Sequence, residues 1–473
     1  MPRRRELVPL ALITALAAAL RLWHIGSQSY WYDESYTVDL VHRGLGDMLS
    51  TIPRTESTPP LYYLLAWVWA KAFGTGEAGL RSLSALIGTA TVPVAWAAAR
   101  ELFGRAQRVA LIAAALVAVN PYFVWYSQEA RAYSLLVFTT ALSLLFLARA
   151  LRDPSRRALA LWAGSAVLAL LTHYFAGFVV VAEAAWLVYA TRRREALLAC
   201  GAVALAGIAL MPLALHQRAS QTTAFIAQLG LGRRVVDLPK KLVTGELGTF
   251  TPAIGPIAGI VAVAAIGYAL LRAGRTALGL LWIAAFGAGV PLAFAIAGSD
   301  YLLPRNVIAV YVPLVLAVAA GLGLARRPAL GLAGAAVICA VAVVVDVEVT
   351  RDARLQRTDW RGAAAALGPG PEAIVVTPAW DQKPLGLYAR SLEPLPLAGA
   401  PVREVVLIGE GQPPTFAEPP APPGFQVAER RKTAGYLMIR YFSSGPIGVS
   451  PATLAASKLG PKPPAFLLRK DSP

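Results

Sequence analysis

The chain has 473 residues, of which 56% are hydrophobic and only 15% are charged. Soluble globular domains carry roughly 25% charged residues, so this composition excludes a chain that is water-soluble throughout. The net charge of +17 does not indicate a nucleic-acid-binding protein, because the arginines form small clusters between apolar runs and not one basic surface with aromatic residues between.

Apolar stretches long enough to cross a bilayer recur from Leu7 to Val345. Arginine clusters separate pairs of these stretches, which places the clusters and the N-terminus in the cytoplasm. We expect an uncleaved first helix and not a signal peptide, because the apolar run continues to Trp23. The sequence therefore predicts eleven transmembrane spans and an outer C-terminus. The spans cover residues 7–23, 81–102, 107–125, 131–151, 158–173, 175–191, 195–215, 252–271, 277–298, 304–325 and 328–346.

Two further helices are predicted at the membrane surface. Pro59 to Phe73 contains only about 15 residues, begins with two prolines and is rich in Trp and Tyr, features that are typical of a helix lying at the interface. Thr37 to Leu49 is predicted as a second juxtamembrane helix. Counting Pro59–Phe73 as a span would place the basic cluster of Arg100, Arg105 and Arg108 outside, against the charge pattern.

The composition changes after Asp346, which sets the predicted domain boundaries. Residues 1–346 are predicted to form the transmembrane domain, 347–445 a small outer α/β domain, and 446–473 a weakly ordered tail. Strands are predicted at Ala373–Thr377, Val405–Ile408 and Tyr436–Phe442, and helices at Arg361–Leu367 and Pro384–Arg390.

The polar residues outside the basic clusters fall in the predicted outer loops. Asp33 and Glu34 follow the first span, and a carboxylate pair suits general-base catalysis; an ordinary acidic loop is the alternative. Glu129 with Arg131 is either part of a site or a local salt bridge. Arg305 either holds a phosphate or reaches to the interface as a snorkelling side chain. His173 is either a ligand or base, or a satisfied interfacial histidine.

Four segments together resemble the GT-C glycosyltransferases, in particular the protein-O-mannosyltransferase and aminoarabinose-transferase superfamily with its bacterial family-39 members. The segments are Trp31–Glu34, Ser57–Leu64, Leu80–Leu86 and Tyr126–Tyr133. The resemblance covers about residues 1–325. Where aminoarabinose transferases carry a lysine before Pro-Pro-Leu, this chain has Thr58, so the phosphate contact is assigned to other cations.

The resemblance implies an inverting transferase that moves a sugar from a polyprenyl-phosphate donor to an acceptor hydroxyl of a cell-envelope glycan, lipid or protein. It acts at the outer face of a bacterial plasma membrane. The implied catalytic residues are Asp33 as general base, Glu34 and Glu129. The donor phosphate would be bound by Arg131 and Arg305, with Lys240 and Lys241 in reserve. The predicted substrate contacts are Tyr32, Tyr62, Tyr133, His173 and Tyr174.

The cofactor and the class of protein stay open at this point. A divalent metal ion is one option, and its ligands would then be Asp33, Glu34 and Glu129. A transporter or lipid-linked sugar flippase would require charges buried mid-span and inverted repeats, whereas here the charges gather on one side. A non-catalytic assembly protein would tolerate loss of the acidic motifs. No nucleic-acid partner is expected.

Overall fold

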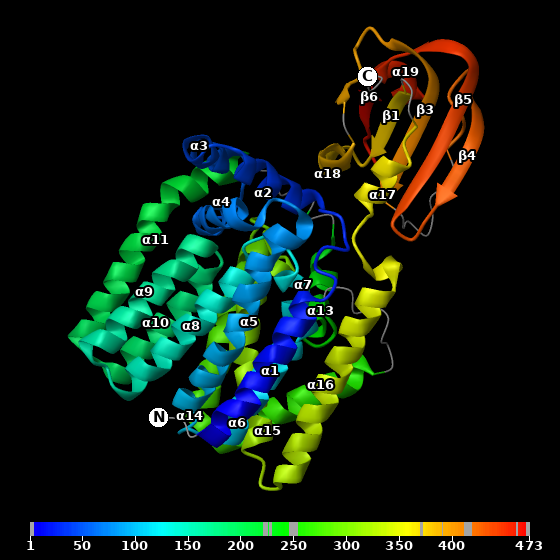
Figure 1. The fold of residues 1–473 in the computed structure, drawn as a ribbon. Helices are drawn as coiled ribbons and strands as arrows, with labels where there is room; N and C mark the ends of the chain where they lie inside the picture. The colour runs from blue at the N-terminus through cyan, green and yellow to red at the C-terminus, as the bar shows by residue number, and fades with distance from the viewer. Residues whose placement is uncertain are drawn as a thin grey trace. The chain divides into compact units, whose positions relative to one another are not determined.

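The computed structural model of the chain describes residues 4–220, 226, 229–245, 254–368, 372–389, 391–410, 419–459 and 462–469 (Figure 1). It divides into two compact units. The membrane unit comprises Met1–Ile25 and Asp39–Glu348, and the sheet unit comprises Gly26–Val38 and Val349–Pro473. The main boundary falls two residues after the predicted one. The segment that carries Asp33 and Glu34, however, groups with the C-terminal residues and not with the helices that flank it in sequence.

The membrane unit is helical throughout its described residues. Its elements are α1 (Arg4–Leu22), α3 (Leu45–Thr55), α4 (Leu61–Phe73), α5 (Glu77–Leu102), α6 (Gln107–Val119), α7 (Pro121–Ser127), α8 (Tyr133–Arg152), α9 (Arg156–Thr172), α10 (Ala176–Thr191), α11 (Arg194–Ser220), α13 (Leu231–Thr244), α14 (Gly255–Ile296), η1 (Pro304–Val310), α15 (Tyr311–Gly323) and α16 (Pro328–Arg351). Helix α2 (Tyr32–His42) crosses the division between the units.

Burial sorts these helices into an interior and a lipid-facing periphery. Helix α15 and the η1 turn before it are almost entirely buried, and α8 is mostly buried, whereas α11 and α16 expose most of their apolar surface. Leucines on α11, such as Leu198 and Leu205, are exposed. Apolar side chains exposed along a whole helix would be unfavourable in water and suit contact with lipid. Among the described residues, six helices are long and apolar enough to cross a membrane, or seven when the bent pair α6 and α7 counts as one span.

The short helices at the predicted membrane surface do form, with one change. Helix α4 has 13 residues, which at 1.5 Å per residue gives about 20 Å, too short for a hydrocarbon core about 30 Å thick. The stretch Thr37–Leu49 is not one helix as predicted. It is shared between α2 and α3, because the chain leaves helical geometry at Gly44, whose extended backbone precedes α3.

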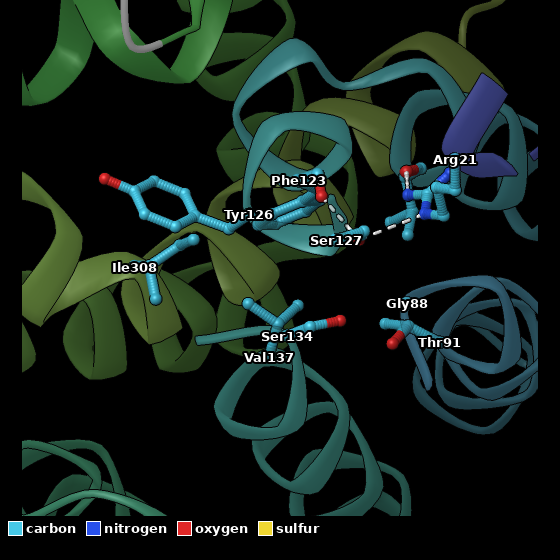
Figure 2. Close-up of a pocket in the computed structure, with 10 residues that line it drawn as sticks. Arg21, Gly88, Thr91, Phe123, Tyr126, Ser127, Ser134, Val137 and Ile308 are labelled. Carbon is cyan, nitrogen blue, oxygen red and sulfur yellow. Dashed lines mark hydrogen bonds between the residues drawn. The ribbon is translucent and has the colours of Figure 1, made fainter. Parts of the chain in front are cut away.

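A buried arginine explains how the sharp bend between α6 and α7 is tolerated inside the bundle. Pro121 ends the hydrogen-bonding ladder of α6, and the two helices meet at 54°. Arg21 of α1 is fully buried and donates to the freed carbonyls of Val117 at 3.1 Å and Ala118 at 2.7 Å. It also donates to Ser127 Oγ (Figure 2), at a distance of 3.2 Å. The guanidinium therefore satisfies carbonyls that would otherwise lack partners in the membrane.

A small cavity lies beside this arginine. It offers about 10 Å³ to the centre of a water molecule, enough for roughly one water. Gly88 of α5 borders it, and a Cβ at this position would lie 2.1 Å from Ser127 Oγ. Close approach of α5 to Arg21 therefore requires glycine at position 88 (Figure 2).

Helix α14 contains a break that matches a predicted loop. Gly274 has φ +45° and ψ −113°, a conformation that glycine adopts readily and other residues do not. The break falls between the predicted spans 252–271 and 277–298. Of these spans, residues 252–253 lie outside the described residues.

The sheet unit holds six strands with short helices. Its elements are η2 (Ala353–Leu355), α17 (Trp360–Ala365), β1 (Glu372–Thr377), η3 (Ala379–Asp381), α18 (Gln382–Tyr388), β2 (Leu392–Pro394), β3 (Ala400–Glu410), β4 (Gln426–Lys432), β5 (Tyr436–Val449), α19 (Pro451–Ala456) and β6 (Ala465–Arg469). The strand order is β2-β6-β1-β3-β5-β4, with β1 and β3 parallel and the other neighbours antiparallel. The predicted α/β character, the three predicted strands and both predicted helices are confirmed, except that Arg390 lies outside the described residues.

The tail differs from its prediction. Residues 446–473 were expected to be weakly ordered, yet they contain the end of β5, helix α19 and strand β6. Strand β6 pairs with both β1 and β2, and Leu467 and Leu468 are buried in the sheet's two apolar layers. Four apolar residues in a row, from Ala465 to Leu468, supply the core contacts that the proline- and lysine-rich flanks obscured.

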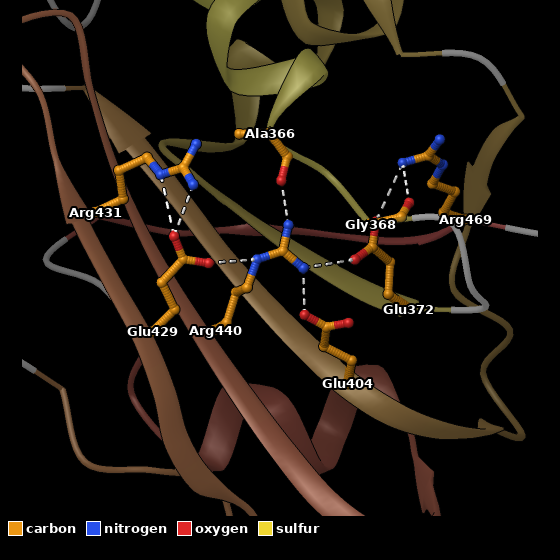
Figure 3. Close-up of polar contacts among 8 residues, drawn as sticks. All are labelled: Ala366, Gly368, Glu372, Glu404, Glu429, Arg431, Arg440 and Arg469. Carbon is orange, nitrogen blue, oxygen red and sulfur yellow. Dashed lines mark hydrogen bonds and ion pairs between the residues drawn. The ribbon is translucent and has the colours of Figure 1, made fainter.

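An ion-pair cluster crosses one end of the sheet. Arg440 of β5 lies among Glu404, Glu429 and Glu372, at 3.1 Å from Glu429 Oε2 and 3.7 Å from Glu372 Oε2, with a close contact to Glu404 (Figure 3). Arg469 of β6 lies 3.4 Å from the other Glu372 oxygen. Burial, with Glu404 nearby, raises the pKa of Glu372 to about 7. The cluster ties five strands together, β1, β3, β4, β5 and β6.

Candidate functional site

The first group of candidate residues lies on Gly26–Val38, which we call the acidic segment. Its second half starts α2, with Trp31 preceding the helix and Asp33 and Glu34 in the first turn, where the helix dipole favours negative charge. Glu34 is fully buried, and its Oε2 accepts from the backbone N–H of Trp31 at 3.5 Å. This contact is half of a capping box. Asp33 is only partly buried, so the two neighbouring carboxylates lie in different environments.

A second group, in the membrane unit, forms around Arg131. Its guanidinium lies 2.9 Å from Glu56 Oε2 and 5.6 Å from the centre of the Tyr63 ring. The Tyr63 hydroxyl donates to Glu56 and lies 2.9 Å from Thr58 Oγ1. All four side chains are buried. Burial raises the pKa of the Tyr63 hydroxyl well above its usual value, so it stays a hydrogen-bond donor.

His173 links this group to Arg305. The imidazole is buried between α9 and α10, and its Nδ1 accepts from the backbone N–H of Phe175 at 3.2 Å. The charges of Arg131 and Arg305 both act on this ring. We call Glu56, Tyr63, Arg131, His173 and Arg305 the cationic cluster.

The predicted substrate-binding tyrosines differ in their exposure. Tyr62 is fully buried with its hydroxyl 3.0 Å from Ser84 Oγ, and Tyr133 is buried with its ring 6.0 Å from that of His173. Tyr174 donates to Gln217 Oε1 at 2.7 Å. Tyr32 is partly exposed at the start of α2, with its hydroxyl 3.0 Å from that of Tyr36.

The remaining predicted residues lie elsewhere in the membrane unit. Glu129 is fully buried in the turn before α8. Lys240 and Lys241 lie on α13, where Lys240 is exposed. This helix is attached to the segment before η1 by Arg234, which forms two contacts with the Asp300 carboxylate at 2.8 and 2.5 Å. Of the predicted outer loop from His216 to Phe250, residues 221–225, 227–228 and 246–250 lie outside the described residues.

Two residues of these groups were not identified from the sequence. Glu56 directly precedes the Ser57–Leu64 motif, and this adjacency was the signal available in the sequence. Arg357 lies 3.8 Å from Glu34 Oε2, although 322 residues separate the two in sequence; no local pattern marks that contact.

The described residues hold no group of three or more His, Cys, Asp or Glu side chains placed to bind a metal ion. We assign no step of the chemistry to a metal.

The model of the dolichyl-phosphate-mannose-protein mannosyltransferase family matches residues 57–216, a range that contains Tyr63, Arg131 and His173 of the cationic cluster. The crystal structure of ArnT from Cupriavidus metallidurans, bound to undecaprenyl phosphate, superimposes with a TM-score of 0.54 at 15% identity, over 91% of this chain and 97% of ArnT. The chain has the GT-C glycosyltransferase fold.

Two further solved structures match the chain with lower scores. The Archaeoglobus fulgidus oligosaccharyltransferase matches with a TM-score of 0.46 at 16% identity, over 80% of this chain and 57% of that protein. The Saccharomyces cerevisiae protein O-mannosyltransferase Pmt1-Pmt2 complex matches with 0.34 at 16% identity, over 52% and 35%. No curated protein matches the chain. The predicted GT-C resemblance is confirmed at the level of fold.

Proposed function

We propose that this GT-C protein transfers a sugar from a polyprenyl-phosphate carrier to an acceptor hydroxyl at the outer face of a bacterial plasma membrane. The observation that carries the proposal is the cationic cluster, in which the buried Arg131 guanidinium lies 2.9 Å from Glu56 Oε2 and 5.6 Å from the centre of the Tyr63 ring. Arginine side chains suit a phosphate group. ArnT, which shares the fold, binds undecaprenyl phosphate.

The chemistry requires one base and one site for the leaving group. Asp33, the more accessible carboxylate of the acidic segment, takes the proton from the acceptor hydroxyl, whose oxygen forms a bond to the anomeric carbon. The bond from that carbon to the phosphate oxygen breaks, and its electron pair leaves with the polyprenyl phosphate. The charge is held by Arg131 and Arg305, with Lys240 and Lys241 as further cations. Displacement from the opposite face inverts the anomeric centre.

Glu129 and the tyrosines take supporting roles in this proposal. Glu129 positions the donor or the acceptor. Because Tyr32 is partly exposed and Tyr62 is fully buried, Tyr32 is the better candidate for contact with a sugar, and Tyr62, Tyr133 and Tyr174 shape the site through packing and hydrogen bonds.

The proposed topology keeps eleven crossings with the N-terminus inside and the sheet unit outside. The crossings would be made by α1, α5, the α6–α7 pair, α8, α9, α10, α11, the two halves of α14 on either side of Gly274, η1 with α15, and α16. Helices α2, α3 and α4 would lie at the outer surface.

The test is turnover of purified protein with a panel of radiolabelled polyprenyl-phosphate sugars, followed as release of polyprenyl phosphate. Asp33→Asn should lower kcat by about 100-fold or more, since a general base contributes 10²–10⁴-fold. Asp39→Asn is the matched control on the same helix, because Asp39 forms a half-exposed ion pair with Arg43 at 3.4 Å. Release that survives Asp33→Asn would remove Asp33 as the base. Absence of turnover with every donor would favour a transporter.

A further inference from the structure

The acidic segment belongs structurally to the sheet unit, and its backbone is held there at several points. Ser29 Oγ donates to Asp359 Oδ1 at 3.1 Å and accepts from the backbone N–H of Arg361 at 3.0 Å. Asp359 also caps α17, accepting from the N–H of Gly362 at 2.9 Å. One serine therefore joins the first outer loop to the start of a helix more than 300 residues later.

Further contacts continue along the segment. The backbone N–H of Arg357 donates to Gln28 Oε1 at 3.0 Å, and the N–H of Tyr30 donates to the Tyr388 hydroxyl at 2.8 Å. At the end of the segment, Lys383 Nζ lies 4.3 Å from the centre of the Tyr36 ring, a cation–π contact. These contacts hold the acidic segment on both sides of Asp33 and Glu34.

Arg357 is the side chain that reaches the acidic pair itself. Its Nη1 lies 3.8 Å from Glu34 Oε2, and its guanidinium carbon lies 5.8 Å from the centre of the Trp31 ring. Both charged side chains are buried, Glu34 completely and Arg357 to all but 8%. A buried carboxylate requires a partner, so loss of Arg357 would destabilise the first turn of α2 that Glu34 caps.

Asp33 and Glu34 therefore divide their functions by environment. Glu34 faces inward to Arg357 and to the N–H of Trp31, which occupies it structurally. Asp33, one residue earlier in the same helical turn, remains partly accessible. Fixing the rotation of this turn fixes the direction of the Asp33 carboxylate, and a base displaced by about 1 Å can lose roughly 100-fold in rate.

We propose that Arg357 is a positioning residue for the transferase reaction, acting through Glu34 to orient Asp33, and that the sheet unit is thereby part of the catalytic apparatus. This inference rests on the proposed function for its kinetic consequence, but the anchoring itself can be measured without turnover. It also reassigns Glu34 from a second catalytic carboxylate to the link between Arg357 and the base.

The first experiment is hydrogen–deuterium exchange of the full-length protein in detergent, followed on peptides that cover residues 26–38. Arg357→Ala should raise exchange of this segment by at least about tenfold, and Arg357→Lys should restore part of the protection because it keeps a cation. Arg354→Ala is the matched control, since Arg354 lies three residues away and pairs with Asp352 at the surface. It should leave the segment unchanged. Unchanged exchange in Arg357→Ala overturns the inference, whatever the protein's activity.

The second experiment is the kinetic one. Arg357→Ala and Glu34→Gln should each lower kcat by about 10- to 100-fold with little change in KM for the donor, and the double variant should lose no more than either single variant. Losses that multiply in the double variant would show that the two residues act independently and would overturn the proposed link. If wild-type protein shows no turnover while the exchange result holds, the proposed function fails and the anchoring stands.

Discussion

Replacing Glu56 tests whether the cationic cluster is held together by its buried carboxylate. Glu56 is 2% exposed and Arg131 is 8% exposed, so their 2.9 Å contact is shielded from water. In Glu56→Ala, the guanidinium loses this carboxylate and the Tyr63 hydroxyl loses the acceptor to which it donates. Removing one partner of a buried ion pair costs about 3–5 kcal/mol, and the Tyr63 hydrogen bond is included in that figure because both contacts end on the same carboxylate.

The assay is thermal and chemical unfolding of purified protein in detergent, with two comparison variants. Glu56→Gln keeps an acceptor for Tyr63 and loses the charge, so it should fall between wild type and Glu56→Ala. Asp47→Ala removes an exposed pair with Arg43 and should change the free energy of unfolding by at most about 1 kcal/mol. If Glu56→Ala is as stable as Asp47→Ala, the cluster does not depend on its buried pair and our account of its electrostatics is refuted.

Three further predictions concern stability. Gly88→Ala should lower the free energy of unfolding by about 1–3 kcal/mol, because its Cβ would meet Ser127 Oγ at 2.1 Å, whereas Gly164→Ala, with open space around it, should not destabilise; equal thermal midpoints would contradict this. Arg440→Met should raise hydrogen exchange in β3 and β5, since it leaves the buried Glu372 beside Glu404 without their shared cation, while Arg431→Met, at the exposed edge, should not. Burial, with Glu410 nearby, raises the pKa of Asp381 to about 8. Ionisation of this carboxyl therefore lowers the free energy of unfolding increasingly from about pH 4 to pH 8. Asp381→Asn should slow hydrogen exchange in β1 by more at pH 8 than at pH 5, once the intrinsic exchange rates at the two pH values are corrected for.

Much of the helical architecture follows from hydropathy and charge. The apolar runs match α1, α5, α8, α10, α11, α15 and α16 within a few residues, because a membrane-spanning stretch must satisfy its backbone internally and carry an apolar surface. The break at Gly274 was predicted from the two arginines that flank it. The juxtamembrane break at Gly44 was missed, since the apolar pattern of Thr37–Leu49 continues through a residue whose backbone is extended.

The candidate site was predictable only in part, for a physical reason. Asp33, Arg131, His173 and Arg305 attract notice because charge near a membrane is expensive. Their partners are set by tertiary contacts, so the sequence did not show that Arg131 would pair with Glu56. Arg21 was hidden in another way: it sits inside an apolar run, and its partners are backbone carbonyls freed by a proline 100 residues later.

Strand β6 lies between β2 and β1 in the sheet, and this position affects the order in which the sheet can form during synthesis. Strand β1 emerges nearly 90 residues before β6, yet one of its edges can be paired only when Ala465–Arg469 has been translated. Until then the nascent sheet presents an open apolar edge, which is a hazard for aggregation. A chain terminated just ahead of Ala465 would retain every helix of the membrane unit and still be expected to reach quality-control proteases with an unfinished sheet.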